Sequence, residues 1–256
     1  MRTSLYASLL GALPAVMSIP VQPAISNTTA LPVHFGLLVF PSFQALDVFG
    51  PMDVLNTFSL LFNSTMHLSV IAKILDPVTT VPQRTARMNM THNEFGQKIV
   101  PTITIKDALA AKKKDGTPDD IDVLIVPGGG GTREPILDEI DFVRTMYPKV
   151  KYIISVCTGA TILARSGILD GRKATTNKRS WVWATSTGPK VDWVHTARWV
   201  EDGNIWSSSG ISAGIDVTYA WLGHVYGEEV ANYVSMSSEY KRWINSTEDP
   251  FAAIWS

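Results

Sequence analysis

The chain has 256 residues, 45% of them hydrophobic, and a formal net charge of −1 at pH 7. This length and hydrophobic content suffice for a full core in one domain, and the near-neutral charge excludes the basic character of a typical nucleic-acid-binding protein. The single cysteine excludes an internal disulfide framework and a cysteine-rich zinc site.

The first 24 residues differ in composition from the rest of the chain. Arg2 precedes a short apolar stretch rich in small residues, which contains Pro14 and ends near Ala24. This pattern is typical of a secretory signal peptide and is too short and interrupted to span a membrane. We therefore expect residues 1–24 to direct the protein into the secretory pathway. The alternative is an extension on a cytoplasmic enzyme, a location that suits a free reactive thiol better.

Four N-glycosylation sequons favour the secretory interpretation. They begin at Asn27, Asn63, Asn89 and Asn245. Because such triplets also arise by chance, they add support to the signal peptide without establishing it. On this interpretation the mature protein is an extracellular glycoprotein with no membrane span.

Between residues 33 and 245, strand patterns alternate with helix patterns. Apolar runs predict buried strands at 33–40, 66–75, 121–126 and 152–156. Residues 81–105 alternate between polar and apolar side chains, which indicates short strands or hairpins. Strands that alternate with helices imply an α/β fold with a mostly parallel sheet and helices on both faces. No repeat or low-complexity linker divides this region, so we expect one domain over 33–245.

The helices are predicted from periodicity and from glycine and proline. Gly50-Pro51 indicates a helix start, because proline early in a helix loses no needed N–H. Residues 135–147 and the stretch after Cys157 predict two more helices. A hairpin is expected around Asp202-Gly203, followed by two helices separated at Gly227.

Cys157 directly follows the apolar run 152–156 and precedes Thr158, Gly159 and a helical stretch. A side chain between a strand and a helix lies on a sharp turn, as does the serine of hydrolase elbows. The start of the helix stabilises negative charge, which predicts a thiol of low pKa. A lone cysteine is also often a small buried hydrophobe, but the order strand, turn, helix favours a nucleophile.

Two further candidates follow neighbouring strands. The glycine run that begins at Gly128 lacks the spacing of a dinucleotide or phosphate loop, so it is either a tight turn or a substrate-binding turn with the Gly129 N–H facing an oxyanion. Asp47 is either a helix cap or a carboxyl group that exchanges a proton near the thiol. Parallel strands end at one sheet edge, so we expect Asp47, Gly129 and Cys157 to converge there.

Four segments, in order along residues 33–240, resemble the ThiJ/PfpI family of the class I glutamine amidotransferase-like superfamily. They are GLLVFPSFQALDVFGPMDVL, DVLIVPGGGG, SVCTGATILARSGILDGRKATT and DGNIWSSSGISAGID. Within the family they are most similar to isocyanide (isonitrile) hydratases. The resemblance implies a flavodoxin-like sandwich and a homodimer, with a cysteine at the elbow. It is less specific for the reaction, because this fold supports many chemistries.

The resemblance also assigns site residues. Cys157 matches the family nucleophile, and Asp47 matches the carboxyl group that faces it in isocyanide hydratases. Thr158 matches the residue after the nucleophile, and Gly128 and Gly129 match the glycines beside the oxyanion position.

One position departs from the pattern of many relatives, which have a histidine after the ATT sequence. This chain has Asn177 there, and none of its five histidines lies in a motif next to the elbow. A cysteine–histidine mechanism therefore lacks its base, and a cysteine–aspartate pair is favoured. Five of the eight tryptophans fall within 181–206, and we expect them mainly in the core, with a subset lining an apolar pocket.

The function implied by the resemblance is hydration of a small isonitrile-like substrate to an N-substituted formamide. The reaction depends on Cys157 and requires no cofactor or metal. Two alternatives stay open: a glyoxalase-like or biosynthetic tailoring enzyme that uses the same cysteine, and a non-catalytic redox-sensing or ligand-binding protein whose thiol oxidises.

Overall fold

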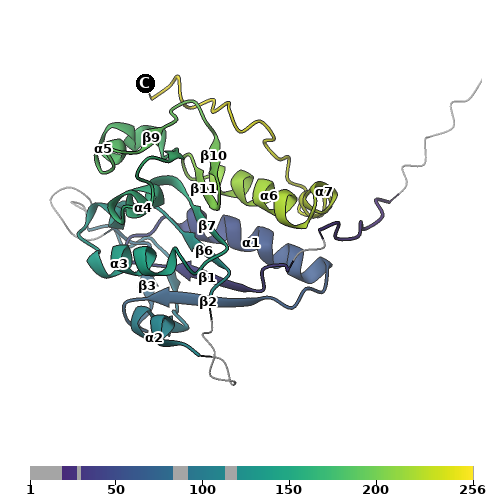
Figure 1. Ribbon diagram of the computed structural model, residues 1–256, viewed down its shortest axis with the longest axis horizontal. Helices are drawn as coiled ribbons and strands as arrows, with labels where there is room; N and C mark the ends of the chain where they lie inside the picture. Colours follow the sequence, from purple (N-terminus) through teal and green to yellow (C-terminus); the bar gives the residue numbers. More distant parts are fainter. Residues whose placement is uncertain (1–18, 28–29, 83–91, 113–119, 256) are drawn as a thin grey trace, which may run out of the picture.

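The computed structural model describes residues 19–27, 30–82, 92–112 and 120–255. At its centre is a seven-stranded sheet (Figure 1). Its strands are β1 (His34–Leu38), β2 (His67–Ala72), β5 (Ile103–Thr104), β6 (Val123–Val126), β7 (Tyr152–Ser155), β10 (Trp199–Asp202) and β11 (Ile205–Ser208). The strand order is β10-β11-β7-β6-β1-β2-β5, and every neighbouring pair is parallel except β10 and β11.

Helices cover both faces of this sheet. One layer holds α1 (Ala45–Leu61), α6 (Ala213–Tyr226) and α7 (Glu228–Ser237). The other holds α2 (Ile105–Ala110), α3 (Leu137–Met146) and α4 (Ala160–Arg165), and Figure 1 shows the two layers on opposite sides of the strands. The expected α/β class, a flavodoxin-like sandwich with a mostly parallel sheet, is confirmed.

Shorter elements complete the described chain. Two small sheets pair β3 (Val78–Thr79) with β4 (Lys98–Ile99) and β8 (Lys173–Ala174) with β9 (Asp192–Trp193). The remaining helix is α5 (Trp181–Ser186), and the 3-10 turns are η1 (Gly130–Arg133), η2 (Cys157–Gly159) and η3 (Lys178–Ser180).

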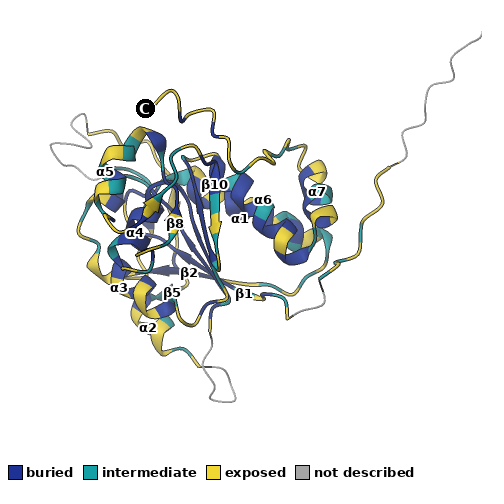
Figure 2. Cartoon of the chain, turned by 45° about the horizontal axis from the view of Figure 1, so that its top comes forward, coloured by how far each residue is buried: buried dark blue, intermediate teal, exposed yellow. Residues whose placement is uncertain are grey.

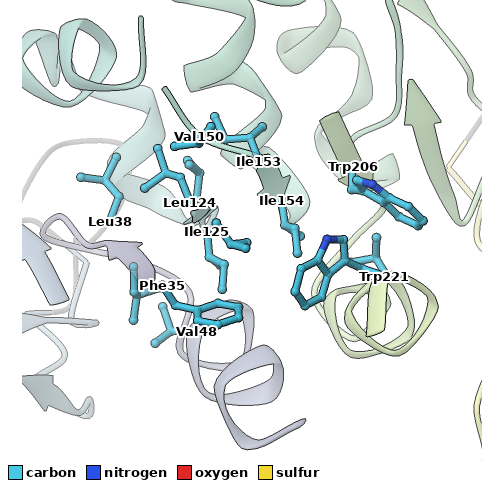
Figure 3. Close-up of a cluster of buried hydrophobic side chains, with 14 of the residues drawn as sticks. Phe35, Leu38, Val48, Leu124, Ile125, Val150, Ile153, Ile154, Trp206 and Trp221 are labelled. Carbon is cyan, nitrogen blue, oxygen red and sulfur yellow. The ribbon is translucent and has the colours of Figure 1, made fainter. Parts of the chain in front are cut away.

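The central strands are apolar along their whole length because both of their faces are buried. In β6 all four residues, Val123–Val126, are buried. Figure 2 shows these strands in dark blue between helices whose outer faces are yellow. Alternate side chains meet different helix layers: in Figure 3, Ile125 and Ile154 point toward α1 and α6, where Val48 and Trp221 lie.

Most of the predicted elements are present. The strands at 33–40, 66–75 and 152–156 appear as β1, β2 and β7, and the helix over 135–147 appears as α3. The hairpin is formed by β10 and β11, with Asp202 paired to Ile205. Gly227 separates α6 from α7. Residues 83–91 of the alternating stretch 81–105 lie outside the described residues, and the described remainder contains the short strands β4 and β5.

The predicted helix start at Gly50-Pro51 is wrong, because α1 begins at Ala45 and both residues lie inside it. Pro51 lacks the N–H that would bond to the carbonyl four residues earlier, and the helix accommodates this loss. Gly50 marks a close helix contact: a Cβ added there would lie 2.8 Å from Cγ1 of Ile215 in α6. The glycine of this pair therefore reflects packing between helices.

The segment after Ala24 packs on the α6–α7 corner. The Ser26 N–H donates to the Tyr226 carbonyl at 3.3 Å, and the Asn27 side-chain amide donates to the Val225 carbonyl at 2.5 Å. The expected signal peptide lies almost wholly outside the described residues. Within the described ranges, no helix combines the length and apolar character needed to cross a bilayer.

The core position Ile154 provides a test of this packing. Its side chain is 0% exposed on β7, so Ile154→Ala leaves a cavity and should lower the free energy of unfolding by about 2–5 kcal/mol. Ile244 is 78% exposed, and the matched change Ile244→Ala should alter it little. Chemical denaturation of both variants measures the difference; equal losses would contradict the assigned core.

Candidate active site

The loops that follow the neighbouring strands β1, β6 and β7 meet at one edge of the sheet. Asp47 lies in the first turn of α1, after β1, and its Oδ2 atom accepts the Gly128 N–H at 2.9 Å. Gly128 follows β6, and the Asp47 carboxyl group also interacts with the Cys157 thiol after β7. The structure therefore brings the predicted residues Asp47, Gly128 and Cys157 together.

Cys157 occupies a strained elbow. Its φ is +58°, a left-handed conformation that non-glycine residues seldom adopt. Two backbone contacts hold it there: its N–H donates to the Ser209 carbonyl at 3.0 Å, and its carbonyl accepts the Thr176 hydroxyl at 3.0 Å. The sharp turn aims the side chain at the sheet edge, although the residue is only 5% exposed.

Three hydrogen-bond donors face the Cys157 sulfur. Two are the backbone N–H groups of Thr158 and Ile211, and the third is the Asn177 side-chain amide. The Asn177 Oδ1 atom accepts the Ser180 N–H at 2.9 Å, so its NH2 group is left to face the sulfur. These donors stabilise a thiolate more than a thiol.

The pKa of the Cys157 thiol is nevertheless raised, to about 12. Burial is the largest cause and the negative charge of Asp47 is the second, and together they outweigh the three donors. The predicted low thiol pKa is therefore wrong. The helix after the elbow, α4, has six residues, and its positive end does not compensate for burial.

Burial has the same effect on Asp47. Its side chain is fully buried, which raises its pKa to about 8 against the opposing hydrogen bonds from Gly128 and Cys157. The second carboxyl oxygen, Oδ1, accepts no hydrogen bond of ordinary geometry from the described residues. The carboxyl group therefore keeps its proton at neutral pH, and the two side chains titrate as a coupled pair.

The glycine turn has a different role from the one expected. The Gly128 N–H is used by Asp47, and the Gly129 N–H donates to the Thr158 hydroxyl at 3.0 Å. Neither N–H is left to face a substrate oxyanion, so in this structure the turn orients the acid and Thr158. A Cβ added to Gly128 would lie 2.6 Å from the Thr158 nitrogen and 2.9 Å from Oδ2 of Asp47, which explains the glycine.

A pocket of about 350 Å³ opens over the thiol. Its lining includes Cys157, Thr158, Asn177 and Ile211. Of the described residues that line it, none is a histidine and none is acidic. In the described ranges, no group of three or more histidine, cysteine, aspartate or glutamate side chains is arranged to hold a metal ion. The pocket presents the Cys157 thiol, and the Asp47 carboxyl group is buried beside it.

Sequence reasoning missed two contributions to the site. It treated Asn177 only as a missing histidine, whereas its amide points at the sulfur. It did not single out Ile211, whose backbone N–H also faces the sulfur and whose φ is +28°. The signal for Ile211 was present, because the segment SSSGISAG belongs to the family-like motifs and follows the strand next to β7.

A buried ionic network supports the loop that carries Ser209. The Ser209 hydroxyl donates to Asp249, from the C-terminal segment. Lys178 Nζ lies 3.5 Å from an Asp249 oxygen, and Arg198 lies 3.7 Å from the other. Burial lowers the pKa of Lys178 to about 8. The Ser209 carbonyl also accepts the Cys157 N–H, so the network helps to hold the Cys157 elbow in place.

The candidate glycosylation sites differ in exposure. Asn63 and Asn245 are exposed, and Asn27 is half-buried with its amide bonded to α6. Asn89 lies outside the described residues.

Fold and site together define an α/β protein of the cysteine-elbow class, and comparison with known proteins identifies the family. The profile of the DJ-1/PfpI family matches residues 35–223, so the chain belongs to that family. An isonitrile hydratase of Pseudomonas putida is 32% identical over 212 residues, which cover 81% of this chain and 78% of that protein.

Other relatives have other activities. A deglycase of Pyrococcus horikoshii is 36% identical over 107 residues, which cover 41% of this chain and 60% of the deglycase. Among solved structures, a ThiJ/PfpI family protein from Pseudomonas syringae superimposes with a TM-score of 0.64 at 24% identity, over 90% of this chain and 85% of that one. An enzymatic activity is consistent with these relatives, which do not share one reaction.

The raised pKa of Asp47 predicts how stability depends on pH. The folded protein keeps this proton up to about pH 8, whereas the unfolded chain loses it near pH 4. Stability should therefore fall as pH rises from about 4 to about 8, by at most about 1.4 kcal/mol per pH unit from this group.

Asp47→Asn should remove this contribution, whereas Asp76→Asn, at an exposed position, should not. Denaturant unfolding at several pH values measures the slopes. A slope in Asp47→Asn as steep as that of the unaltered protein would mean that Asp47 ionises normally in the folded state.

Proposed function

We propose that the protein is a cysteine-dependent hydratase that converts an isonitrile to an N-substituted formamide. The observation that carries the proposal is the pairing of the Cys157 thiol with the buried, protonated Asp47 in a pocket that histidine does not line. The similarity to an isonitrile hydratase over most of both chains supports it.

The first step forms a bond between the Cys157 sulfur and the terminal carbon of the isonitrile. The Asp47 carboxylate takes the thiol proton as this bond forms and passes it to the same carbon, which gives a thioimidate, R–N=CH–S–Cys, and the carboxylate again. The isonitrile carbon accepts both the sulfur and a proton, so the chemistry requires an acid beside the nucleophile. The position of Asp47 next to the thiol meets this requirement.

The second step consumes one water. The Asp47 carboxylate takes a proton from water as the oxygen adds to the thioimidate carbon, and passes this proton to the nitrogen. The carbon–sulfur bond then breaks while the Asp47 carboxylate carries the hydroxyl proton to the leaving sulfur, which releases R–NH–CHO and restores the thiol. The donors from Thr158, Ile211 and Asn177 stabilise the sulfur as it leaves.

Asp47→Asn tests the proton transfer. The variant should keep its fold and its thiol but lose turnover by about a hundredfold or more, the usual contribution of a positioned acid. Cys157→Ala should be inactive, and Asp76→Asn should match the unaltered protein. Formamide production from a neutral isonitrile measures all three; near-normal rates in Asp47→Asn would show that another group moves the proton.

The rate should rise with pH through about 8. Below that pH the pair holds two protons and the sulfur is a poorly nucleophilic thiol. Loss of one proton ionises Asp47, and its carboxylate then takes the thiol proton as the sulfur attacks. A pH profile of kcat/KM measures this midpoint, which should be absent in Asp47→Asn. A rate that falls through pH 8 would contradict the scheme.

A glyoxalase- or deglycase-like activity is the second candidate, because a deglycase is among the relatives. In such a reaction the Cys157 thiol would act on a carbon of an α-oxoaldehyde, or of its adduct, in place of the isonitrile carbon. Assaying methylglyoxal beside the isonitriles, with Cys157→Ala as control, separates the two. Oxidation of Cys157 without turnover of either substrate favours a redox-sensing role.

Assembly and location are also proposals. We propose a homodimer that acts on a small molecule, on the strength of the family resemblance. We propose entry into the secretory pathway through residues 1–24. The docking of Ser26 and Asn27 on α6 supports a mature chain that starts just before them.

A further inference from the structure

The strained elbow at Cys157 is held by backbone contacts to two different loops. Its N–H donates to the Ser209 carbonyl, after β11, and its carbonyl accepts the Thr176 hydroxyl, after β8. A residue at a left-handed φ, here +58°, keeps that conformation only while its surroundings impose it. The position of the thiol therefore depends on what fixes Ser209 and Thr176.

Both of these residues are tied to one buried ion pair. The Ser209 hydroxyl donates to the Oδ2 atom of Asp249, and Lys178 Nζ donates to the Thr176 carbonyl at 3.2 Å. Lys178 Nζ lies 3.5 Å from the same Oδ2 atom, and the two charged side chains are 1% and 0% exposed. The ion pair thus joins the two loops that hold the elbow.

Further contacts fix the ion pair itself. Lys178 Nζ also donates to the Thr175 hydroxyl at 2.8 Å and to the Ala197 carbonyl at 3.0 Å. The second carboxylate oxygen of Asp249 lies 3.7 Å from an Arg198 nitrogen. Each charged group is therefore held from several directions, which makes the pair a rigid connection between the loops.

Two of the donors that face the sulfur lie next to these anchor points. Asn177 stands between Thr176 and Lys178, and Ile211 follows Ser209 by two residues. The Asn177 amide and the Ile211 N–H both face the sulfur of the elbow. A shift of either loop would therefore displace a donor as well as the elbow.

Asp249 belongs to the C-terminal segment, which also borders the site. Its Oδ1 atom accepts the Phe251 N–H at 3.1 Å. Phe251 and Trp255 line a groove of about 220 Å³ that shares Asn177 and Ile211 with the thiol pocket. The negative partner of the ion pair thus comes from a segment outside the central sheet.

Stability alone does not account for a buried ion pair. Two charges lose their hydration on burial, and apolar residues of similar volume often replace such a pair with no loss of stability. The pair provides something that apolar residues do not, because its directional hydrogen bonds fix the orientation of Ser209 and Thr176. Geometry at the elbow is therefore the property to examine.

We propose that Lys178 and Asp249 are positioning residues for the reaction. Their ion pair holds the two loops on either side of the elbow, and so sets how the donors on those loops meet the Cys157 sulfur. This inference rests on the proposed hydratase function, in which these donors stabilise the sulfur as it leaves. Both side chains are buried, so they act through the loops and not by contact with the substrate.

The test removes both charges in the double variant Lys178→Met/Asp249→Asn. Because Arg198 keeps its ion pair with Asp216 at 2.8 Å, the double variant should resist denaturant better than Lys178→Met alone, which leaves Asp249 without its lysine. Its kcat at pH 7, per folded protein, should nevertheless fall about tenfold or more, since the thiol and its donors are displaced. The substrate is methyl isonitrile, whose substituent is too small to need the groove.

A matched control removes an exposed ion pair. Lys190 Nζ lies 3.0 Å from an Asp170 oxygen, and the two side chains are 76% and 42% exposed. The double variant Lys190→Met/Asp170→Asn should keep the kcat of the unaltered protein.

An infrared measurement reports on the sulfur without turnover. Cys157 is the single cysteine of the chain, so the protein has one S–H stretching band. The frequency of this band depends on the hydrogen bonds at the sulfur. It should shift in Lys178→Met/Asp249→Asn and stay in place in the control. If the unaltered protein hydrates no isonitrile but the band shifts in this way, the hydratase function fails and the positioning role stands.

Two milder variants keep the test decisive if the double variant does not fold. Ser209→Ala removes the hydroxyl bond to Asp249, and Thr176→Val removes the hydroxyl bond to the Cys157 carbonyl, while both retain the ion pair. Each should shift the S–H band and lower kcat severalfold.

In a protein that hydrates isonitriles, the positioning role requires both the lower kcat and the shifted band. A double variant that keeps either property of the unaltered protein would overturn the role, because the pair would then support folding only. Normal kcat in both milder variants would overturn it as well. In each case the hydratase function remains intact.

Discussion

The burial of one carboxyl group beside one thiol is the constraint on which the rest of the site depends. Asp47 receives a single backbone hydrogen bond, from Gly128, and burial raises its pKa to about 8. A carboxylate in that place would be poorly solvated and would raise the pKa of the Cys157 thiol further. The site therefore favours keeping one proton on the pair, and burial makes the thiol the weaker acid of the two.

The neighbouring loops are arranged around that proton. The sulfur accepts from Thr158, Ile211 and Asn177, whereas the carboxyl group accepts from Gly128 and from the Cys157 thiol. The donors at the sulfur stabilise the negative charge that develops there as the sulfur attacks and leaves. The positive φ angles of Cys157 and Ile211 belong to the same arrangement, because the elbow aims the Cys157 side chain into the site and Ile211 turns its N–H toward the sulfur.

The fold was largely predictable from the sequence, and the site only in part. Long apolar runs such as Val123–Val126 specify buried parallel strands, and an elbow follows from the order of strand, cysteine and glycine. The start of α1 was missed because Gly50-Pro51 is a typical terminus signal, whereas here the glycine permits contact with Ile215. The thiol pKa was misjudged because a sequence does not reveal how deeply a group is buried. The donors from Ile211 and Asn177 depend on loop geometry that no local pattern encodes.

The C-terminal segment has two ties to the site. Asp249 bonds Ser209, whose carbonyl holds the elbow, while Phe251 and Trp255, a few residues later, line the groove next to the thiol. The anchor and the groove wall therefore lie on one short stretch outside the central sheet. Replacing the side chains beyond the anchor changes the shape of the groove without disturbing a strand or the elbow. Substitutions in the C-terminal segment can therefore change which substrates fit the groove while the hydrophobic core keeps its stability.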